Sequence, residues 1–293
     1  MSEKNNLKIW IQGARLRTLP LAFAPVIAGT GVASVTGGAK LGLAFLALLV
    51  SLFLQIGVNY ANDYSDGIRG TDEFRVGPLR LTGSGSAKPE AVKFAAFAAF
   101  GLAAITGLLI VVLTQQWWML FIGLLAILAA WFYTGGKSPY GYSGLGEMAV
   151  FVFFGLVATI GTSYIQTTVV SELSILSGIG VGLYATAVLL VNNIRDIDTD
   201  KLASKRTIAV LMGPRLSKLV YLSMVWLPLS ISAFLFLLYP ATLLSSAVIL
   251  LLVPITLIAS RKASSKDLIA ALKLTSYAGL VYGLGLGFGF WLS

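Results

Sequence analysis

The chain has 293 residues, of which 57% are hydrophobic and 11% are charged, and its formal net charge at pH 7 is +9. This composition predicts one integral-membrane domain over residues 1–293 and gives no sign of a separate soluble domain. The sequence has no Cys and no His, which excludes Cys or His nucleophiles, disulfides, and metal binding through thiolate or imidazole groups. Its basic residues lie between apolar segments, which favours membrane topology and anionic lipid over nucleic acid.

The N-terminal stretch 1–12 is polar and lacks the charged-then-apolar order of a cleaved signal peptide. We expect a short amphipathic helix there, with Trp10 at the level of the lipid headgroups. Nine apolar spans of roughly 20 residues follow, the length that crosses a bilayer. They cover approximately 18–36, 41–63, 91–113, 117–134, 147–167, 173–195, 217–237, 241–260 and 268–292. The expected fold class is therefore all-α, a polytopic bundle of nine transmembrane helices.

Basic residues are concentrated in the N-terminal stretch and in the loops after the second, fourth, sixth and eighth spans. They include Lys4, Arg15, Arg69, Arg75, Arg80, Lys137, Lys201, Lys205, Arg206, Arg261 and Lys262. The opposite loops carry almost no basic residue except Lys40. By the positive-inside rule, the N-terminus is expected in the cytoplasm and the C-terminus outside.

A polar stretch closes the second apolar span, and we call residues 59–72 the first Asp motif. Four of its side chains fall at i, i+3, i+4 and i+7, which is one face of a helix: Asn59, Asn62, Asp63 and Asp66. Gly67 and Gly70 then break the helix and allow Asp72 to return from a loop. Carboxylates are costly at membrane depth and persist there mainly for function.

A similar pattern closes the sixth span, and we call residues 192–200 the second Asp motif. Asn192, Asp196 and Asp200 lie at i, i+4 and i+8 of the same expected helix, whereas Asp198 points away from their face. Of the twelve acidic residues in the chain, seven lie in or beside the two motifs. These are Asp63, Asp66, Asp72, Glu73, Asp196, Asp198 and Asp200. Oxygen ligands of this kind suit Mg²⁺, and two facing clusters can hold it around one diphosphate. A solvated helix end is the alternative interpretation of each motif.

Each motif is followed by basic residues. Arg75 and Arg80 follow the first motif and are candidates to bind a diphosphate, because the guanidinium fork matches phosphate oxygens. Lys201, together with Lys205 and Arg206, repeats this arrangement after the second. The alternative for all of them is a purely topological role.

The loop 133–147 is rich in Gly and Tyr and contains both a Lys and a Glu. Tyr rings at a membrane surface commonly form an aromatic belt. Their clustering in one loop favours a substrate-binding role for Tyr133, Lys137 and Tyr140. Before the first span, Arg15 and Arg17 stand close to the membrane, and Arg17 is the stronger candidate to meet a substrate carboxylate because it lies within about one turn of the span.

These residues carry a family resemblance. Asn62-Asp63-x-x-Asp66 with Asp72, paired with Asp196-x-x-x-Asp200, resembles the signature of UbiA-type intramembrane aromatic prenyltransferases. The resemblance runs from Arg17-Thr-Leu-Pro20 through Lys205-Arg206-Thr. More narrowly, the chain resembles the menaquinone-pathway branch, the 1,4-dihydroxy-2-naphthoate polyprenyltransferases. The motifs that carry this are Asn59-Tyr-Ala-Asn62-Asp63-Tyr, Arg75-x-Gly77-Pro78, Tyr133-Thr-Gly-Gly136, Pro139-Tyr-Gly-Tyr-x-Gly-Leu-Gly-Glu147 and Asn192-Asn193-x-Arg195-Asp196.

The resemblance implies a central cavity, capped on the cytoplasmic side and open laterally to the lipid of the cell membrane. It implies that Asp63, Asp66, Asp196 and Asp200 hold Mg²⁺ with help from Asn59, Asn62 and Asn192. The implied reaction joins a polyprenyl diphosphate to 1,4-dihydroxy-2-naphthoate with loss of carbon dioxide. Alternatives are another aromatic acceptor, such as 4-hydroxybenzoate or homogentisate, or a membrane transporter. Protein partners are not indicated.

Overall fold

A computed structural model describes residues 3–70 and 80–293 of the chain, and every regular element in these ranges is helical. The first half contains α1 (Glu3–Gly13), η1 (Leu16–Thr18), α2 (Pro20–Thr36), α3 (Leu41–Ile68), α4 (Pro89–Thr114), α5 (Met119–Phe132), η2 (Tyr140–Tyr142), α6 (Gly146–Val150), η3 (Phe151–Val157) and α7 (Ala158–Thr167). The second half contains α8 (Glu172–Arg195), α9 (Ile197–Leu202), α10 (Ile208–Trp226), α11 (Pro228–Phe236), η4 (Pro240–Val248), α12 (Ile249–Ser260) and α13 (Ser265–Trp291).

Seven helices in the described part of the chain are long and apolar enough to cross a membrane. The segments Leu7–Thr18 and Pro20–Thr36 form an eighth span if this pair, bent by 48°, is counted as one, and α5 is a shorter apolar helix. Together these elements occupy all the positions at which the sequence predicts spans. The chain is therefore a multi-pass membrane protein of the expected all-α class.

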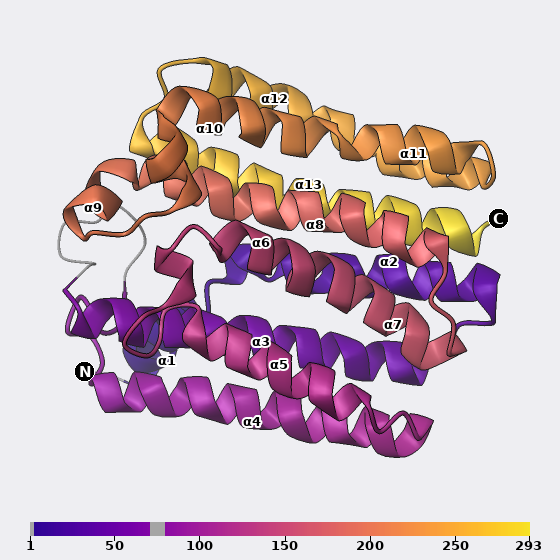
Figure 1. Cartoon of the computed structure of the whole chain (residues 1–293), viewed down its shortest axis with the longest axis horizontal. Coiled ribbons are helices and arrows are strands. Elements are labelled where there is room, and N and C mark those ends of the chain that lie inside the picture. Colours follow the sequence, from indigo (N-terminus) through magenta and orange to yellow (C-terminus); the bar gives the residue numbers. More distant parts are fainter. Residues whose placement is uncertain (1–2, 71–79) are drawn as a thin grey trace.

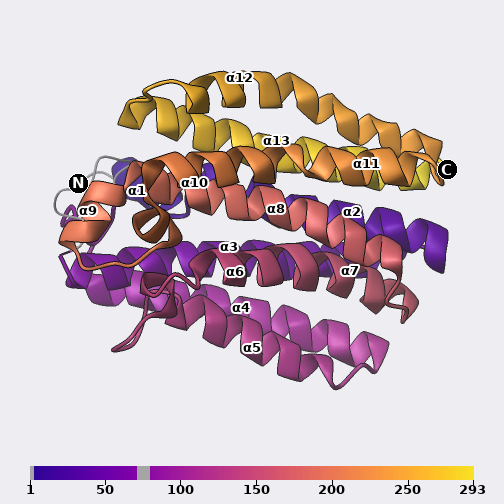
Figure 2. The same cartoon turned by 45° about the horizontal axis from the view of Figure 1, so that its top comes forward.

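The long helices lie side by side along one axis (Figure 1). The N-terminus, α1 and α9 lie at one end of the bundle and the C-terminus lies at the other, in both views (Figures 1 and 2). The two Asp motifs close α3 and α8 at the end where α9 lies. The fold thus brings the two motifs to one end of the bundle.

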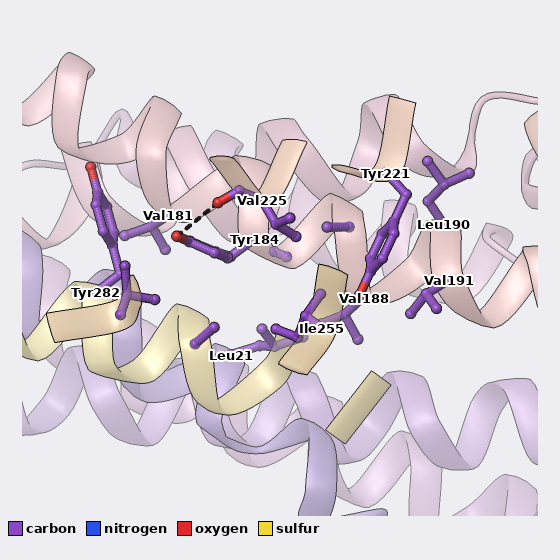
Figure 3. Packing of buried hydrophobic residues seen from close by; sticks show 14 of the residues in the cluster. Leu21, Val181, Tyr184, Val188, Leu190, Val191, Tyr221, Val225, Ile255 and Tyr282 are labelled. Atoms are coloured by element: carbon purple, nitrogen blue, oxygen red, sulfur yellow. Dashed lines mark hydrogen bonds between the residues drawn. The ribbon is translucent and has the colours of Figure 1, made fainter. Parts of the chain in front are cut away.

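Helix α8, which carries the second motif, lies at the centre of the packing. In its most apolar 18-residue window 72% of the residues are buried, compared with 22% in α3. Three Tyr rings with at most 1% exposure fill the core around α8, namely Tyr184, Tyr221 and Tyr282 (Figure 3). Their hydroxyls are all hydrogen-bonded, as for Tyr184, which donates to the Val225 carbonyl at 3.0 Å. The second motif therefore begins at the end of a helix, α8, that is tightly packed in the core.

The span from Gly146 to Thr167 contains a π-helical segment, η3, between α6 and α7. Gly155 within η3 packs so closely on α8 that a Cβ added there would lie 2.4 Å from the Cα of Gly182. Such contacts between small residues allow membrane helices to approach closely. The widened turn is consistent with the frequent occurrence of π-bulges at functional sites, because Phe153 and Phe154 of η3 line the cavity described below.

Candidate active site

A cavity of about 550 Å³ opens inside the bundle, with a polar end and an apolar length. The apolar length is lined by side chains of α3, α4, α5, η3 and α7. The polar end brings together residues from both Asp motifs, the N-terminal link and the loops. They are Arg15, Arg17, Asn59, Asn62, Asp66, Arg80, Tyr133, Thr134, Tyr140, Tyr142, Asn192, Asn193, Asp196, Asp200 and Lys205. Most of the residues that the sequence predicts for the site therefore share one space.

Asp63 differs from Asp66, Asp196 and Asp200, because it is fully buried and is not among the residues that line the cavity. Its two carboxylate oxygens accept hydrogen bonds from the backbone amides of Leu81 and Thr82, at 2.9 and 2.8 Å. A carboxylate that accepts two amide hydrogens holds the donating segment firmly in place. Asp63 thus anchors the segment after residue 80 against α3, and its predicted role as a metal ligand stays a prediction.

Asp66, one turn further along α3, connects three parts of the chain. Its Oδ1 accepts a hydrogen bond from the Tyr142 hydroxyl at 2.6 Å and one from Lys205 Nζ at 3.2 Å. Arg80 Nη2 lies 4.0 Å from its Oδ2. The Asp66 carboxylate therefore joins the segment after the first motif, the Tyr-rich loop and the loop after the second motif.

The Tyr-rich loop is docked on the end of α3. The Thr134 hydroxyl donates to Asn62 Oδ1 at 2.8 Å, and the guanidinium of Arg69 donates to the carbonyls of Thr134 and Gly136. Tyr140 also lines the cavity, and its hydroxyl donates to the Ala129 carbonyl at 2.7 Å. Burial raises the pKa of Tyr140 to about 12, so the side chain is a neutral phenol at physiological pH.

The second motif does not continue as one helix, because α8 ends at Arg195 and α9 begins at Ile197. The helix break falls on Asp196, whose backbone φ and ψ are −97° and 9°. The carboxylate of Asp196 is bound by its neighbour, since Arg195 Nε donates to Oδ1 at 2.7 Å and Nη2 to Oδ2 at 2.6 Å. Arg195 Nη2 also donates to Asn192 Oδ1 at 2.9 Å. The break re-aims the end of this motif, which the sequence pattern did not predict.

Lys205 links the two motifs. Its backbone amide donates to the Asp200 carbonyl at 2.8 Å, while its side chain reaches Asp66 and lies 4.4 Å from the centroid of the Tyr142 ring. Burial alone would lower the pKa of Lys205, but the carboxylate of Asp66, with Tyr142 and Asp200, outweighs burial and the pKa is raised. Lys205 is therefore a cation at the point where the motifs meet.

Asn59 makes a contact that the sequence pattern does not predict, and its expected part in substrate and metal binding stays a prediction. Its Nδ2 donates to the Ala14 carbonyl at 2.9 Å and to Thr18 Oγ1 at 3.2 Å, which ties the link between α1 and α2 to α3. This link carries both Arg15 and Arg17 on the cavity wall. Asn59 thus positions two basic residues in addition to lining the cavity itself.

Some predicted residues are not brought to the cavity. Lys137 and Lys201 are exposed and do not line it, as is also true of Asp198. Asp72 and Arg75 lie outside the described residues.

Tyr142 and Lys205 line the site, but no sequence pattern singled out either of them as a partner of Asp66. Their contacts with Asp66 join positions that are 76 and 139 residues apart in the chain. Only their place in motifs rich in Tyr or basic residues signalled them.

The side chains at the polar end provide oxygen atoms, which are the ligands that a hard divalent cation prefers. Asn62, Asp66, Asp196 and Asp200 offer oxygen ligands to one cavity. Within residues 3–70 and 80–293, no group of three or more acidic residues is placed so that it could hold a metal ion by carboxylates alone. A cation there would therefore share its coordination with amide oxygens, water or the phosphate oxygens of a substrate.

The chain is similar to known proteins over most of its length. The model of the UbiA prenyltransferase family matches residues 22–291. A 1,4-dihydroxy-2-naphthoate octaprenyltransferase of Mycobacterium tuberculosis is 50% identical over 212 residues, covering 72% of each chain. A protein of the same name from Mycobacterium leprae is 49% identical over 212 residues, covering 72% of each chain. Another from Escherichia coli is 40% identical over 210 residues, covering 70% of this chain and 68% of that one.

Solved structures share the fold of this chain. A UbiA homologue from Aeropyrum pernix aligns with a TM-score of 0.69 at 18% identity, covering 94% of this chain and 97% of that one. A UbiA homologue from Archaeoglobus fulgidus, bound to GPP and Mg²⁺, aligns with a TM-score of 0.65 at 18% identity, covering 95% and 99% of the two chains. From the sequence match over most of its length, the chain belongs to the UbiA prenyltransferase family.

Proposed function

We propose that this protein transfers a polyprenyl group from a polyprenyl diphosphate to 1,4-dihydroxy-2-naphthoate. The transfer forms a bond from the ring carbon to the prenyl group, releases diphosphate and carbon dioxide, and gives demethylmenaquinol, the reduced form of demethylmenaquinone. One observation carries the proposal: a single cavity holds residues of both Asp motifs at one end and apolar walls along the rest. Such a space accepts a molecule with a charged head and a long hydrocarbon tail. The names of the relatives at 40–50% identity support the choice of acceptor.

We propose Mg²⁺ as the cofactor, in keeping with the Mg²⁺ bound to the Archaeoglobus fulgidus homologue. Asp66, Asp196 and Asp200 would supply carboxylate ligands, not all three to the same cation as they are placed here, and Asn62 and the phosphate oxygens of the substrate would complete the coordination. When bound, the cation would neutralise the diphosphate and make it a better leaving group. Asp63 would join these ligands only by releasing the amides of the segment that it anchors.

Basic side chains at the polar end would complete the binding of the diphosphate. Arg80 and Lys205 stand beside Asp66 and line the same cavity. The Arg80 fork matches two phosphate oxygens, and the Lys205 ammonium supplies a compact charge. Both cations are already held near a carboxylate, so binding the diphosphate needs little rearrangement of the chain.

The apolar walls would protect the allylic cation that forms as the carbon–oxygen bond to the diphosphate breaks. Phe153 and Phe154 of η3 bring aromatic rings to the cavity, and such rings attract a carbocation through their faces. The small residues Ala103, Gly107 and Gly123 leave space along α4 and α5 for the prenyl chain. Exclusion of water directs the cation to the electron-rich naphthoate ring.

We propose that the protein resides in the cell membrane with its N-terminus and both Asp motifs in the cytoplasm and its C-terminus outside. The basic residues of the loops beside both motifs support this orientation. The two chain termini lie at opposite ends of the bundle, as this topology requires (Figure 1).

The test is incubation of the purified protein in lipid with a polyprenyl diphosphate, Mg²⁺ and one aromatic acid at a time. We expect prenylated product from 1,4-dihydroxy-2-naphthoate and little or none from 4-hydroxybenzoate or homogentisate. Preference for one of the latter acids would move the protein to another branch of the family. Failure with every acid, together with uptake of one of these compounds into sealed vesicles, would favour the transporter.

A further inference from the structure

We propose that Arg15 and Gln55 form the subsite that receives the carboxylate and the neighbouring hydroxyl of the aromatic acid. The proposal rests on the proposed function, because it assigns a place in the cavity to the acceptor. It also differs from the sequence expectation, which favours Arg17 for this role.

Arg15 is held in an unusual backbone conformation. It lies in the link between α1 and η1 with φ 54° and ψ 63°, the left-handed region that residues with a Cβ rarely adopt. The Arg15 carbonyl accepts hydrogen bonds from the amide of Thr18 at 2.8 Å and from its hydroxyl at 2.9 Å. The preceding carbonyl, of Ala14, is bound by Asn59. Strain of this kind persists where the surroundings impose it and is common at ligand sites.

No carboxylate of residues 3–70 and 80–293 forms an ion pair with the guanidinium of Arg15. Arg15 lines the cavity, and its Nη2 is buried without a hydrogen-bond partner in the described part of the chain. The ion pairs between described residues join Arg80 and Lys205 to Asp66 and Arg195 to Asp196, and none involves Arg15. Arg15 as a whole is half-buried, but a buried charged donor atom that makes no hydrogen bond is unfavourable. An anionic ligand in the cavity would supply the missing partner.

Gln55 offers the complementary group. Its side chain lines the cavity with 5% exposure, and its Oε1 is buried without a partner in residues 3–70 and 80–293. The orientation of the amide follows from Thr18, whose hydroxyl donates to the Arg15 carbonyl and therefore accepts from Gln55 Nε2 at 3.1 Å. Oε1 is thus the acceptor left over, and a phenolic hydroxyl is a donor that it can bind.

The Thr18 hydroxyl links the backbone carbonyl of Arg15 to the side-chain amide of Gln55, and these two residues carry one unsatisfied cationic donor and one unsatisfied neutral acceptor. A phenolic acid with its hydroxyl next to its carboxylate presents the matching anion and donor. A diphosphate presents only acceptors at physiological pH, so it matches Arg15 but leaves Gln55 Oε1 unsatisfied.

The position along α3 also separates this subsite from the diphosphate. Asn59, which holds the Arg15 link, precedes Asp66 by seven residues, or about 10 Å along the helix axis at 1.5 Å per residue. The carboxylates and paired cations gather at the Asp66 level. A distance of this size leaves room for an aromatic ring between the two anionic groups.

The experiment measures KM for both substrates with full-length protein in lipid nanodiscs. Arg15→Gln is expected to raise KM for 1,4-dihydroxy-2-naphthoate about ten- to hundredfold, as for loss of one charged hydrogen-bonding partner, with KM for the prenyl diphosphate changed by less than about threefold. Gln55→Met is expected to raise KM for the acid by about two- to tenfold. Arg215→Gln, an exposed site on α10, is the matched control for loss of one positive charge.

A second ligand isolates the carboxylate. 1,4-Dihydroxynaphthalene has the same rings and hydroxyls but no carboxylate, so as a competitive inhibitor it should bind equally well to the wild type and to Arg15→Gln. An equal loss of affinity for this compound would overturn the assignment, because the variant would then have damaged the cavity as a whole. The assignment would also be overturned if Arg17→Gln, and not Arg15→Gln, produced the selective rise in KM for the acid.

A third variant separates binding from folding. Glycine adopts the left-handed region without strain, so Arg15→Gly should retain or raise the melting temperature while raising KM for the acid as Arg15→Gln does. A marked fall in melting temperature with unchanged KM would make Arg15 a structural residue and overturn the proposal. Failure of the wild type to use 1,4-dihydroxy-2-naphthoate at all would instead refute the proposed function, and that result is visible without any variant.

Discussion

The first and second Asp motifs are alike in sequence, yet the protein holds their leading carboxylates by different means. Asp63 accepts hydrogen bonds from two backbone amides of a segment 18 and 19 residues away. Asp196 is paired with the guanidinium of the residue before it. The first arrangement fixes a loop through neutral donors, whereas the second neutralises a charge locally. Equivalent positions of a repeated motif therefore need not have equivalent roles.

The later acids of the two motifs are more alike. Asp66 and Asp200 both line the cavity, and both are in contact with Lys205, through its side chain and its backbone amide respectively. In each motif one acid is thus held by the protein, and another, three or four residues later, stands where the two halves of the chain meet. We therefore expect the later acids, Asp66 and Asp200, to belong to one shared site.

The largest effect is expected from removal of divalent metal. If both motifs serve one metal-assisted departure of diphosphate, chelation with EDTA should abolish prenyl transfer and added Mg²⁺ should restore it. Product formation is measured by chromatography, with the protein's melting temperature as a control for integrity. Full turnover in EDTA would show that Lys205 and Arg80 suffice at this site without a metal.

Loss of the local ion pair should be the most damaging of the structural changes. Arg195→Gln leaves the buried carboxylate of Asp196 without its bidentate partner, and breaking a buried pair typically costs about 3–5 kcal/mol. The free energy of unfolding in detergent measures this effect, with the exposed Lys262→Gln as control. A change no larger than the control would mean that Asp196 does not depend on Arg195.

Asp63→Asn should have a smaller effect on stability. An Asn side chain can accept from one of the amides of Leu81 and Thr82, but its NH₂ group faces the other, which costs about 1–3 kcal/mol for the unsatisfied donor. Faster proteolysis of the segment after residue 80, compared with the exposed control Asp198→Asn, would accompany this loss. If the variant is as stable as the wild type and only inactive, Asp63 acts as a ligand and not as an anchor.

The smallest effect on activity is expected from single-cysteine variants. Labelling of their thiols tests whether both motifs lie on one side of the membrane. The native chain has no Cys, so Ser84→Cys, Leu202→Cys and Ser293→Cys each give one exposed thiol. In intact cells an impermeant reagent should label only position 293. Labelling of both 84 and 202 from outside would mean that the orientation is the reverse of the proposed one. Labelling of only one of them would mean that the two motifs lie on opposite sides of the membrane.

The helix positions were predictable because the apolar spans are long and the loops between them are polar. All predicted spans correspond to helical segments, including α5, which is shorter than the others. The break at Asp196 was not predictable, since Asn192, Asp196 and Asp200 suit an uninterrupted helix by spacing. The π-helical turn of η3 was equally hidden, because its apolar sequence suits an α-helix just as well.

The membership of the site was partly predictable, whereas its internal contacts were not. Helical spacing was sufficient to place Asn62 and Asp66 on one face of α3, whereas Asp200 reaches the same cavity from α9, beyond the helix break. The contact of Lys205 with Asp66 joins residues 139 positions apart, and no local pattern encodes such a pairing. The choice between Arg15 and Arg17 likewise depends on a backbone conformation that only the folded chain reveals.

The central claim is that Asp66 and Asp200, from different halves of the chain, act at one site. The most direct measurement is the Mg²⁺-dependent affinity for an unreactive prenyl thiodiphosphate in a double-mutant cycle with Asp66→Asn and Asp200→Asn. We predict that each single change weakens binding and that the double variant is little worse than the weaker single one, because residues of one site are strongly non-additive. Losses of free energy that simply add would contradict the account and place the two acids at independent sites.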